Sequence, residues 1–240
     1  MIPKIIHQIY FDLRGKDISQ IELFDTSSKR LQKMYPDWKY ILWSEKMCEN
    51  LVSDKLPGHY EFYKSMKYDI QRIDYMRFVI LKFYGGIYID LDIIPIKPLS
   101  DSILNFPFIS YSFKDIIPKH NEFVQNDLMG SHVGFKLWDY LIDCLPGNYK
   151  QKASMEIYDV RKARFVLYTT GPRYMGKLLK KLMPKYTPLK NLVYTKWKNG
   201  NWKNLNRKDF YFENYVSGGW LDTMSNNKPS KTFYLKKTEL

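Results

Sequence analysis

One feature limits the possible folds of this chain most. It is a helical pattern that stops at a Gly-Gly pair and is followed at once by an alternating strand pattern. The apolar side chains of the helix recur every three or four positions, at Ile70, Ile73, Met76, Ile80 and Phe83. This spacing predicts an amphipathic helix over residues 66–84. Gly85-Gly86 ends the helix, and residues 87–94 then alternate as one strand closed by prolines. A helix followed directly by a strand is typical of an α/β fold.

Other segments extend this pattern into a sheet. Residues 4–10 and 38–43 are rich in β-branched and aromatic residues and predict two more strands. Ser44 stands where it can cap a short following helix. Weaker helical patterns cover 135–145 and 174–183. We therefore expect an α/β fold of Rossmann type, with a mostly parallel central sheet flanked by helices.

Length and composition limit the number of domains and the kinds of partner that we expect. The 240 residues contain no repeat and no clear linker, so we expect one domain. The net charge of +13 favours anionic partners, namely nucleic acid, an anionic membrane or phosphorylated substrates, although it also fits simple solubility. Cys48 and Cys144 lack the spacing of a zinc or disulfide site. The polar N-terminus and the lack of a long apolar run predict a cytoplasmic protein.

Two carboxylates in the strand over 87–94 carry the strongest chemical signal. On one strand, Tyr88, Asp90 and Asp92 would share a face. Two carboxylates on an otherwise apolar strand repel each other, and a divalent cation removes that repulsion. Oxygen ligands completed by substrate phosphates suit Mn²⁺ or Mg²⁺, and open α/β sheets bind ligands at the carboxyl ends of strands. The alternative is a solvated strand face with no ligand.

The stretch DYMRFVILKFYGGIYIDLD, residues 74–92, resembles the glycosyltransferases with a DXD sugar-binding region. That family includes yeast mannosyltransferases, capsular polysaccharide enzymes and, more distantly, the clostridial glucosylating toxins. Residues 2–10 are similar to its opening strand, and the resemblance extends well over about residues 2–100 and loosely beyond. It implies a GT-A fold, a retaining transfer from a nucleotide-diphosphate sugar, and Mn²⁺ or Mg²⁺ as the cofactor.

The resemblance also implies the roles of four charged residues. Asp92 would bind the metal directly, whereas Asp90 would contact the ribose and, partly through water, the metal. Asp74 and Arg77 would bind the donor sugar or its phosphate, and the planar guanidinium of Arg77 suits phosphate. Asp90, Asp92 and Arg77 form the expected catalytic set, because the metal and Arg77 offset charge on the leaving group. The alternative for Asp74 and Arg77 is an ordinary ion pair within a helix.

Five further residues are expected near the donor. By position in the family, Tyr10 would stack on the base and Trp43 would end the second strand. Tyr88 would lie near the nucleotide, Asp127 would face the donor sugar, and Trp220 would cover the donor phosphates. Tyr10 could instead belong to the core, and Asp127 could cap a loop. His7 is interpreted as a structural histidine.

The C-terminal segment departs from the family. Asn214 and Tyr215 stand where the family has histidines, which leaves the third protein ligand of the metal open among Glu213, Asn214, Ser217 and water. Thr170-Gly171-Pro172 resembles a turn that is common in the family.

The sequence thus predicts a metal-dependent hexosyl- or N-acetylhexosaminyltransferase. UDP-sugars are the first expectation for the donor and GDP-mannose the second, with a glycan, glycoconjugate or other hydroxyl as acceptor. The donor half would span about 1–100 and the acceptor half about 101–224, followed by a frayed tail over 225–240. No nucleic acid is expected as partner, and the basic stretch 177–185 could touch a membrane or be a solvated helix face. The alternatives are a non-catalytic protein that binds sugar nucleotides and a basic nucleic-acid-binding protein.

Overall fold

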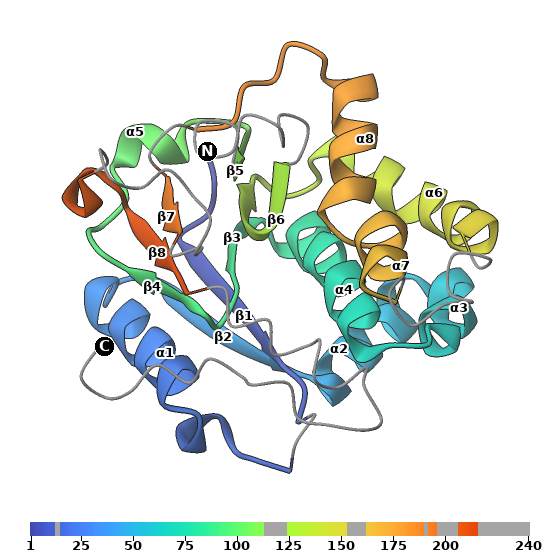
Figure 1. Ribbon diagram of the computed structural model, residues 1–240, viewed down its shortest axis with the longest axis horizontal. Coiled ribbons are helices and arrows are strands. Elements are labelled where there is room, and N and C mark those ends of the chain that lie inside the picture. Colours follow the sequence, from blue (N-terminus) through green and yellow to red (C-terminus); the bar gives the residue numbers. More distant parts are fainter. Residues whose placement is uncertain (13–14, 113–123, 153–161, 190–191, 196–205, 216–240) are drawn as a thin grey trace.

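A five-stranded sheet runs through the middle of the molecule, with the strands in the order β2-β1-β3-β6-β5 (Figure 1). These strands are β1 (Ile5–Tyr10), β2 (Lys39–Ser44), β3 (Gly86–Ile89), β5 (Phe108–Ser112) and β6 (Val124–Ser131). β1 pairs in parallel with β2 and β3, whereas β6 is antiparallel to both β3 and β5. Only β6 therefore runs against the other four, which confirms the expected mostly parallel sheet.

The computed structural model describes residues 1–12, 15–112, 124–152, 162–189, 192–195 and 206–215. A second, three-stranded sheet in this part of the chain has the order β4-β8-β7. Its strands are β4 (Ile93–Pro95), β7 (Val193–Thr195) and β8 (Phe212–Asn214). β8 is antiparallel to β4 and parallel to β7, so the second sheet joins residues more than a hundred positions apart.

Helices cover both faces of the central sheet. They are α1 (Glu22–Met34), α2 (Glu45–Lys55), α3 (Tyr60–Ser65), α4 (Asp69–Tyr84), α5 (Asp101–Leu104), α6 (Lys136–Lys152), α7 (Lys162–Thr169) and α8 (Pro172–Leu182), with short 3-10 turns η1 (Ile18–Gln20), η2 (Pro57–His59) and η7 (Arg207–Asp209). Figure 1 shows α1 and the second sheet on one side, and α4, α6, α7 and α8 on the other. None of the helices in the described part of the chain combines the length and apolarity that crossing a bilayer requires.

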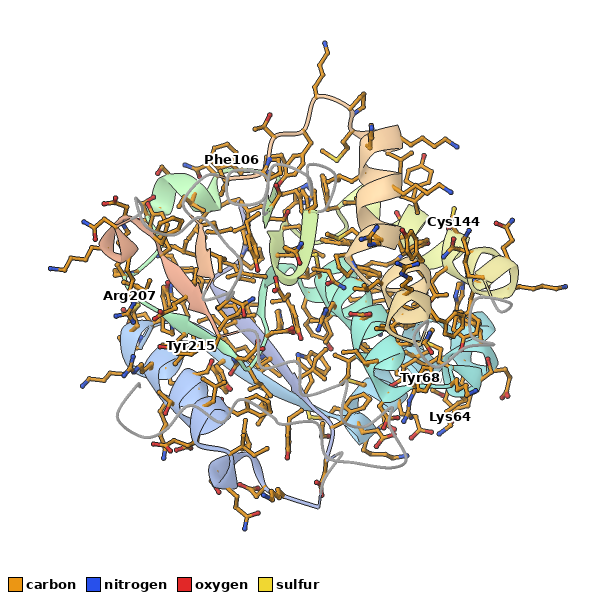
Figure 2. All side chains as sticks on the ribbon, in the orientation of Figure 1. Lys64, Tyr68, Phe106, Cys144, Arg207 and Tyr215 are labelled. Carbon is orange, nitrogen blue, oxygen red and sulfur yellow. The ribbon has the colours of Figure 1, made fainter. Side chains whose placement is uncertain are left out.

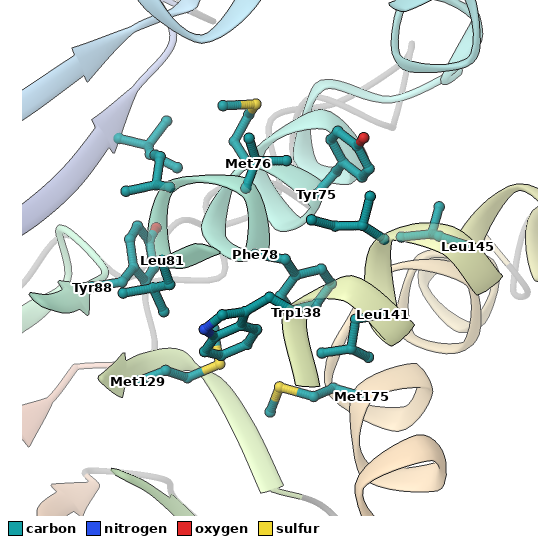
Figure 3. Packing of buried hydrophobic residues seen from close by; sticks show 14 of the residues in the cluster. Tyr75, Met76, Phe78, Leu81, Tyr88, Met129, Trp138, Leu141, Leu145 and Met175 are labelled. Carbon is teal, nitrogen blue, oxygen red and sulfur yellow. The ribbon is translucent and has the colours of Figure 1, made fainter. Parts of the chain in front are cut away.

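Each face of the sheet has its own apolar core. On the α4 side, Phe78 of α4 stacks on Trp138 of α6, with ring centroids 6.0 Å apart, and Met129 and Tyr88 of the sheet belong to the same cluster (Figure 3). On the α1 side, apolar residues of the sheet such as Ile87 pack with α1 and the second sheet. The strands are apolar on both faces because helices and the second sheet cover both.

The junction between α4 and β3 depends on its two glycines. Gly85 follows the last residue of α4 with φ of 61°, and Gly86 opens β3 with φ of 84°. A Cβ on Gly86 would lie 2.6 Å from the carbonyl oxygen of Ile5, so β3 can approach β1 this closely only with glycine there. The expected end of the helix at this pair is confirmed.

The expectation of one strand over residues 87–94 is wrong. β3 ends at Ile89, and the amide of Ile93 donates to the carbonyl of Asp90 at 3.1 Å, which closes a turn. β4 then begins at Ile93 and pairs with β8 in the other sheet. The alternating pattern is that of two short buried strands, so Tyr88, Asp90 and Asp92 do not share one strand face.

Candidate functional site

The turn formed by Asp90, Leu91 and Asp92 lies where β3 ends, beside the carboxyl end of its parallel neighbour β1. Its backbone is tied on both sides: the amide of Asp90 donates to the carbonyl of Asp127 on β6 at 2.7 Å, and the amide of Tyr215 donates to the carbonyl of Asp92 at 3.0 Å. The expected position at a carboxyl-terminal edge, where open α/β sheets bind ligands, is thus found in a turn rather than on a strand.

Arg77 of α4 joins two of the expected site residues. Its Nη1 donates to Asp74 at 2.7 Å, and its Nη2 donates to both oxygens of Asp90 at 2.8 and 3.0 Å. The guanidinium lies over the ring of Tyr88, 5.1 Å from the centroid, and the hydroxyl of Tyr88 also donates to Asp90. The Arg77 side chain is only 5% exposed. Arg77 and Tyr88 therefore fix the orientation of the Asp90 carboxylate.

Asp74 is the buried anchor of this network. Besides Arg77, its carboxylate accepts from Nδ2 of Asn126 at 2.9 Å and from Oγ1 of Thr170 at 2.8 Å. Burial raises the pKa of Asp74, and the charge of Arg77 opposes that rise. Asp74 and Arg77 are thus a buried pair with additional hydrogen bonds rather than an ordinary ion pair on a helix surface. Thr170 comes from the turn that resembles the family.

A bulge in β6 brings Asp127 to the site. Ser110 of β5 pairs with Met129 and Ser112 with Val124, so two steps along β5 face five along β6. The carboxylate Oδ2 of Asp127 accepts from the hydroxyl of Tyr111 on β5 at 2.8 Å and from Nδ2 of Asn214 on β8 at 2.7 Å. Its Oδ1 is buried and has no hydrogen-bond partner among the described residues.

The carboxylates at the turn carry more negative charge than Arg77 offsets. Burial raises the pKa of Asp90, Arg77 opposes this, and the nearby charges of Asp92 and Asp127 raise the pKa further. Counting Asp74, four carboxylates surround a single guanidinium. Such an excess of negative charge fits a bound cation.

The cation would need ligands from the substrate. In the described part of the chain, no three His, Cys, Asp or Glu side chains are placed to hold a metal ion together. Arg77 and Tyr88 already contact the Asp90 carboxylate, so water and donor phosphates would supply much of the coordination shell, as is usual for Mg²⁺.

A second buried network holds the turn from behind. Oγ of Ser27 on α1 donates to the carbonyl of Ile93 at 2.6 Å, and Nε2 of Gln8 on β1 donates to Ser27 at 3.1 Å and reaches the carbonyl of Asp90 at 3.5 Å. Oε1 of Gln8 accepts from Ser28 and Tyr40. The sequence reasoning missed this network. The sequence carries no signal for it, because the burial of Ser27 and Ser28 depends on partners in β1 and β2.

The structure shows other contacts for two further expected donor residues. Trp43 is buried in the core, packs against Tyr84 and donates its indole N–H to His7, so the structure does not bring it to the carboxylate cluster. Tyr10 is half-buried at the carboxyl end of β1, where its hydroxyl donates to the carbonyl of Lys16 and its ring meets the edge of Phe24. Its role toward a base stays a prediction.

The described end of the chain shows which candidate for a third metal ligand lies near the carboxylates. Asn214 points to Asp127, whereas Glu213 is buried against Arg207 and the hydroxyl of Tyr215. Figure 2 labels both Arg207 and Tyr215 near β8. Asn214 is therefore the candidate that the fold brings to the site. Ser217 and Trp220, expected near the donor phosphates, lie outside the described residues.

Comparisons with known proteins identify the family that this chain resembles. Residues 22–109 match the family model described as the glycosyltransferase sugar-binding region containing a DXD motif. The chain is 32% identical over 185 residues to the mannosyl phosphorylinositol ceramide synthase SUR1 of Saccharomyces cerevisiae, an alignment that covers 75% of this chain and 42% of the yeast protein. It is 27% identical over 227 residues to inositol phosphoceramide mannosyltransferase 2 of Schizosaccharomyces pombe, covering 92% and 58%. The chain thus spans about half the length of these curated relatives.

Solved structures support the fold. The PaToxG glycosyltransferase superposes with a TM-score of 0.55 at 18% identity, over 76% of this chain and 70% of that one. Mouse xyloside xylosyltransferase 1 in its apo form superposes with a TM-score of 0.50 at 10% identity, over 91% and 99%. The expected GT-A fold is confirmed.

Proposed function

This chain belongs to the family of glycosyltransferases whose sugar-binding region contains a DXD motif, and we propose that it transfers a mannosyl group from a nucleotide-diphosphate donor. The acceptor we propose is a hydroxyl on the inositol phosphate headgroup of a glycolipid. The names of the two curated relatives support both the mannosyl group and this acceptor class. GDP-mannose, the second expectation from sequence, becomes the first choice of donor.

The observation that carries this proposal is the excess of carboxylates over guanidinium groups at the turn. Asp90 and Asp92 from one turn come together with Asp127 from β6, and Arg77 is their cationic partner. A nucleotide diphosphate is itself an anion, so this edge of the sheet can accept it only together with a cation. A sugar nucleotide bound with a divalent metal meets that requirement.

Each residue of the site has a distinct role in the proposed transfer. A divalent cation, when bound at Asp92, would offset negative charge on the departing diphosphate. Arg77, aimed by Asp74, places a second positive charge at the same edge. Asp127 presents Oδ1 to a hydroxyl of the donor sugar. With retention of configuration, the acceptor hydroxyl attacks from the face that the diphosphate leaves, and the diphosphate takes its proton.

Thermal unfolding with a panel of GDP- and UDP-sugars, with and without Mn²⁺, tests the donor and the metal together. We expect GDP-mannose to raise the midpoint of the wild type only when metal is present, because binding to the folded state stabilises it. Asp92→Asn should lose this shift. Asp101→Asn, which changes an exposed carboxylate on α5 far from the turn, should keep it.

The outcomes separate the parts of the proposal. A shift by a UDP-sugar alone would overturn the mannosyl donor and keep the transferase. No shift by any sugar nucleotide would overturn the transferase and favour the non-catalytic alternatives. The acceptor is tested by transfer of labelled mannose to inositol phosphoceramide, with ceramide lacking the headgroup as the control; equal labelling of both would contradict the acceptor class.

A further inference from the structure

We propose that Tyr111 and Asn214 are positioning residues that hold Asp127 so that its Oδ1 accepts a hydrogen bond from a hydroxyl of the donor sugar. This inference rests on the proposed function. It gives Tyr111 of β5 a role that the sequence did not suggest, and it gives Asn214 of β8 a role other than that of a third metal ligand.

The geometry is a closed triangle of hydrogen bonds. The Tyr111 hydroxyl and the Asn214 amide both reach Oδ2 of Asp127, at 2.8 and 2.7 Å, and the Asn214 amide also lies 3.2 Å from the Tyr111 hydroxyl. Two donors on one oxygen restrict rotation of the carboxylate about its terminal bond. The other oxygen is thereby kept in one place.

The other oxygen, Oδ1, is available to accept a hydrogen bond from a ligand. Oδ1 of Asp127 is buried and has no partner among the described residues. Leaving a buried carboxylate oxygen unpaired is unfavourable, so such an atom in a folded site is best explained by a donor that the ligand supplies.

A hydroxyl fits this oxygen better than a metal ion. Asp127 is near enough to Asp92 for their charges to interact, yet no three acidic or other ligating side chains in the described ranges are placed to share one ion. Asp127 follows Asn126, which contacts the anchor Asp74 of the Arg77 network. A sugar next to the diphosphate would lie between these groups and can donate from several hydroxyls.

Calorimetric titration of GDP-mannose and of GDP alone, both with Mn²⁺, isolates the sugar contact. We expect Tyr111→Phe to raise the Kd of GDP-mannose about tenfold, the effect of one hydrogen bond to a charged group, and to leave the Kd of GDP unchanged. Asn214→Leu should act in the same direction and replaces Tyr111→Phe in the comparison if that variant does not fold. Tyr174→Phe is the matched control, because it removes an equally buried hydroxyl that donates to the carbonyl of Leu141 in α6.

A double variant distinguishes positioning from simple packing. In an Asp127→Asn background, Tyr111→Phe should have no further effect on the Kd of GDP-mannose, since both changes act through one carboxylate.

Three results would overturn the inference while the proposed function stands: Tyr111→Phe behaves like Tyr174→Phe, it weakens GDP and GDP-mannose equally, or its effect persists in the double variant. If the wild type binds GDP but not GDP-mannose, or binds neither, the proposed function and the inference fall together.

Discussion

The indole nitrogen of Trp43 lies 3.1 Å from Nδ1 of His7, and this contact determines where the buried imidazole carries its proton. An indole N–H can only donate, so Nδ1 accepts and the proton resides on Nε2. Nε2 then donates to the carbonyl of Gly85 at 2.9 Å, at the junction of α4 and β3. This assignment follows from the donor capacities of the two partners. His7 is thus a structural residue, as expected from sequence.

The neutral state of His7 makes stability depend on pH. Burial lowers the pKa of His7 from 6.5 to about 4. The unfolded chain therefore binds this proton at higher pH than the folded one, and stability should fall as the pH decreases from 6.5 toward 4. The full loss is about 3 kcal/mol. Urea unfolding between about pH 7 and pH 4 measures it. His7→Gln should show a shallower slope, and identical slopes would refute the assignment.

Removing Arg77 should destabilise the fold strongly. Arg77→Met leaves Asp74 buried without its charge partner, which typically costs about 3–5 kcal/mol. The control is Lys29→Met, since Lys29 pairs with Asp25 on α1 while its side chain is 73% exposed. That change should cost at most about 0.5 kcal/mol. Equal losses in urea unfolding would mean that Arg77 is not the buried partner described here.

Gly86 and Gly134 both have a positive φ, but they should differ in how well they tolerate substitution by alanine. Gly86→Ala combines φ of 84° with a Cβ only 2.6 Å from the Ile5 carbonyl oxygen, whereas Gly134→Ala has φ of 69° and open space. Both changes carry the backbone cost of about 1–2 kcal/mol, and only Gly86→Ala must also move β1 or β3. Urea unfolding should therefore show a larger loss for Gly86→Ala; a smaller one would contradict the close approach of the strands.

The hydroxyl of Ser27 should affect both stability and ligand binding. Ser27→Ala removes the buried bond to the Ile93 carbonyl and should cost about 1–3 kcal/mol. Because that bond holds the end of the Asp90 turn, the metal-dependent shift by GDP-mannose should also shrink. Ser65→Ala removes an exposed hydroxyl that donates to Phe62 and should change stability by less than about 0.5 kcal/mol. If GDP-mannose with metal raised the unfolding midpoint of Ser27→Ala as much as that of the wild type, the α1 network would not support ligand binding at the turn.

Local patterns predicted the elements with strong periodicity. The helix expected over 66–84 is α4, the strands expected over 4–10 and 38–43 are β1 and β2, and Ser44 caps α2 by accepting from the amide of Met47. α1 was not expected, because its inward face includes Ser27 and Ser28, whose burial depends on partners in β1 and β2. These two serines interrupt the apolar positions of the inward face, such as Leu31 and Met34, and so weaken the helical pattern.

Most of the predicted site residues come from one segment. Asp74, Arg77, Tyr88 and Asp90 lie within seventeen residues, and the structure brings them into one network. The orientation of Asp127 depends on a bulge in β6, which has no signal in the alternation of side chains. The split of residues 87–94 into two strands likewise depends on β8, whose sequence position gives no indication that it pairs with β4.

The pairing of Ile93 with Asn214 has a consequence for how the protein is made. A ribosome releases β3 and the Asp90 turn long before it synthesises β8. Until then β4 lacks its neighbour and Asp127 lacks one of its two donors. Domains form their long-range contacts only after the distant segment is available. A nascent chain can therefore build α4 with its Gly-Gly junction early, but Asp127 acquires both of the donors described above only after β8 has emerged.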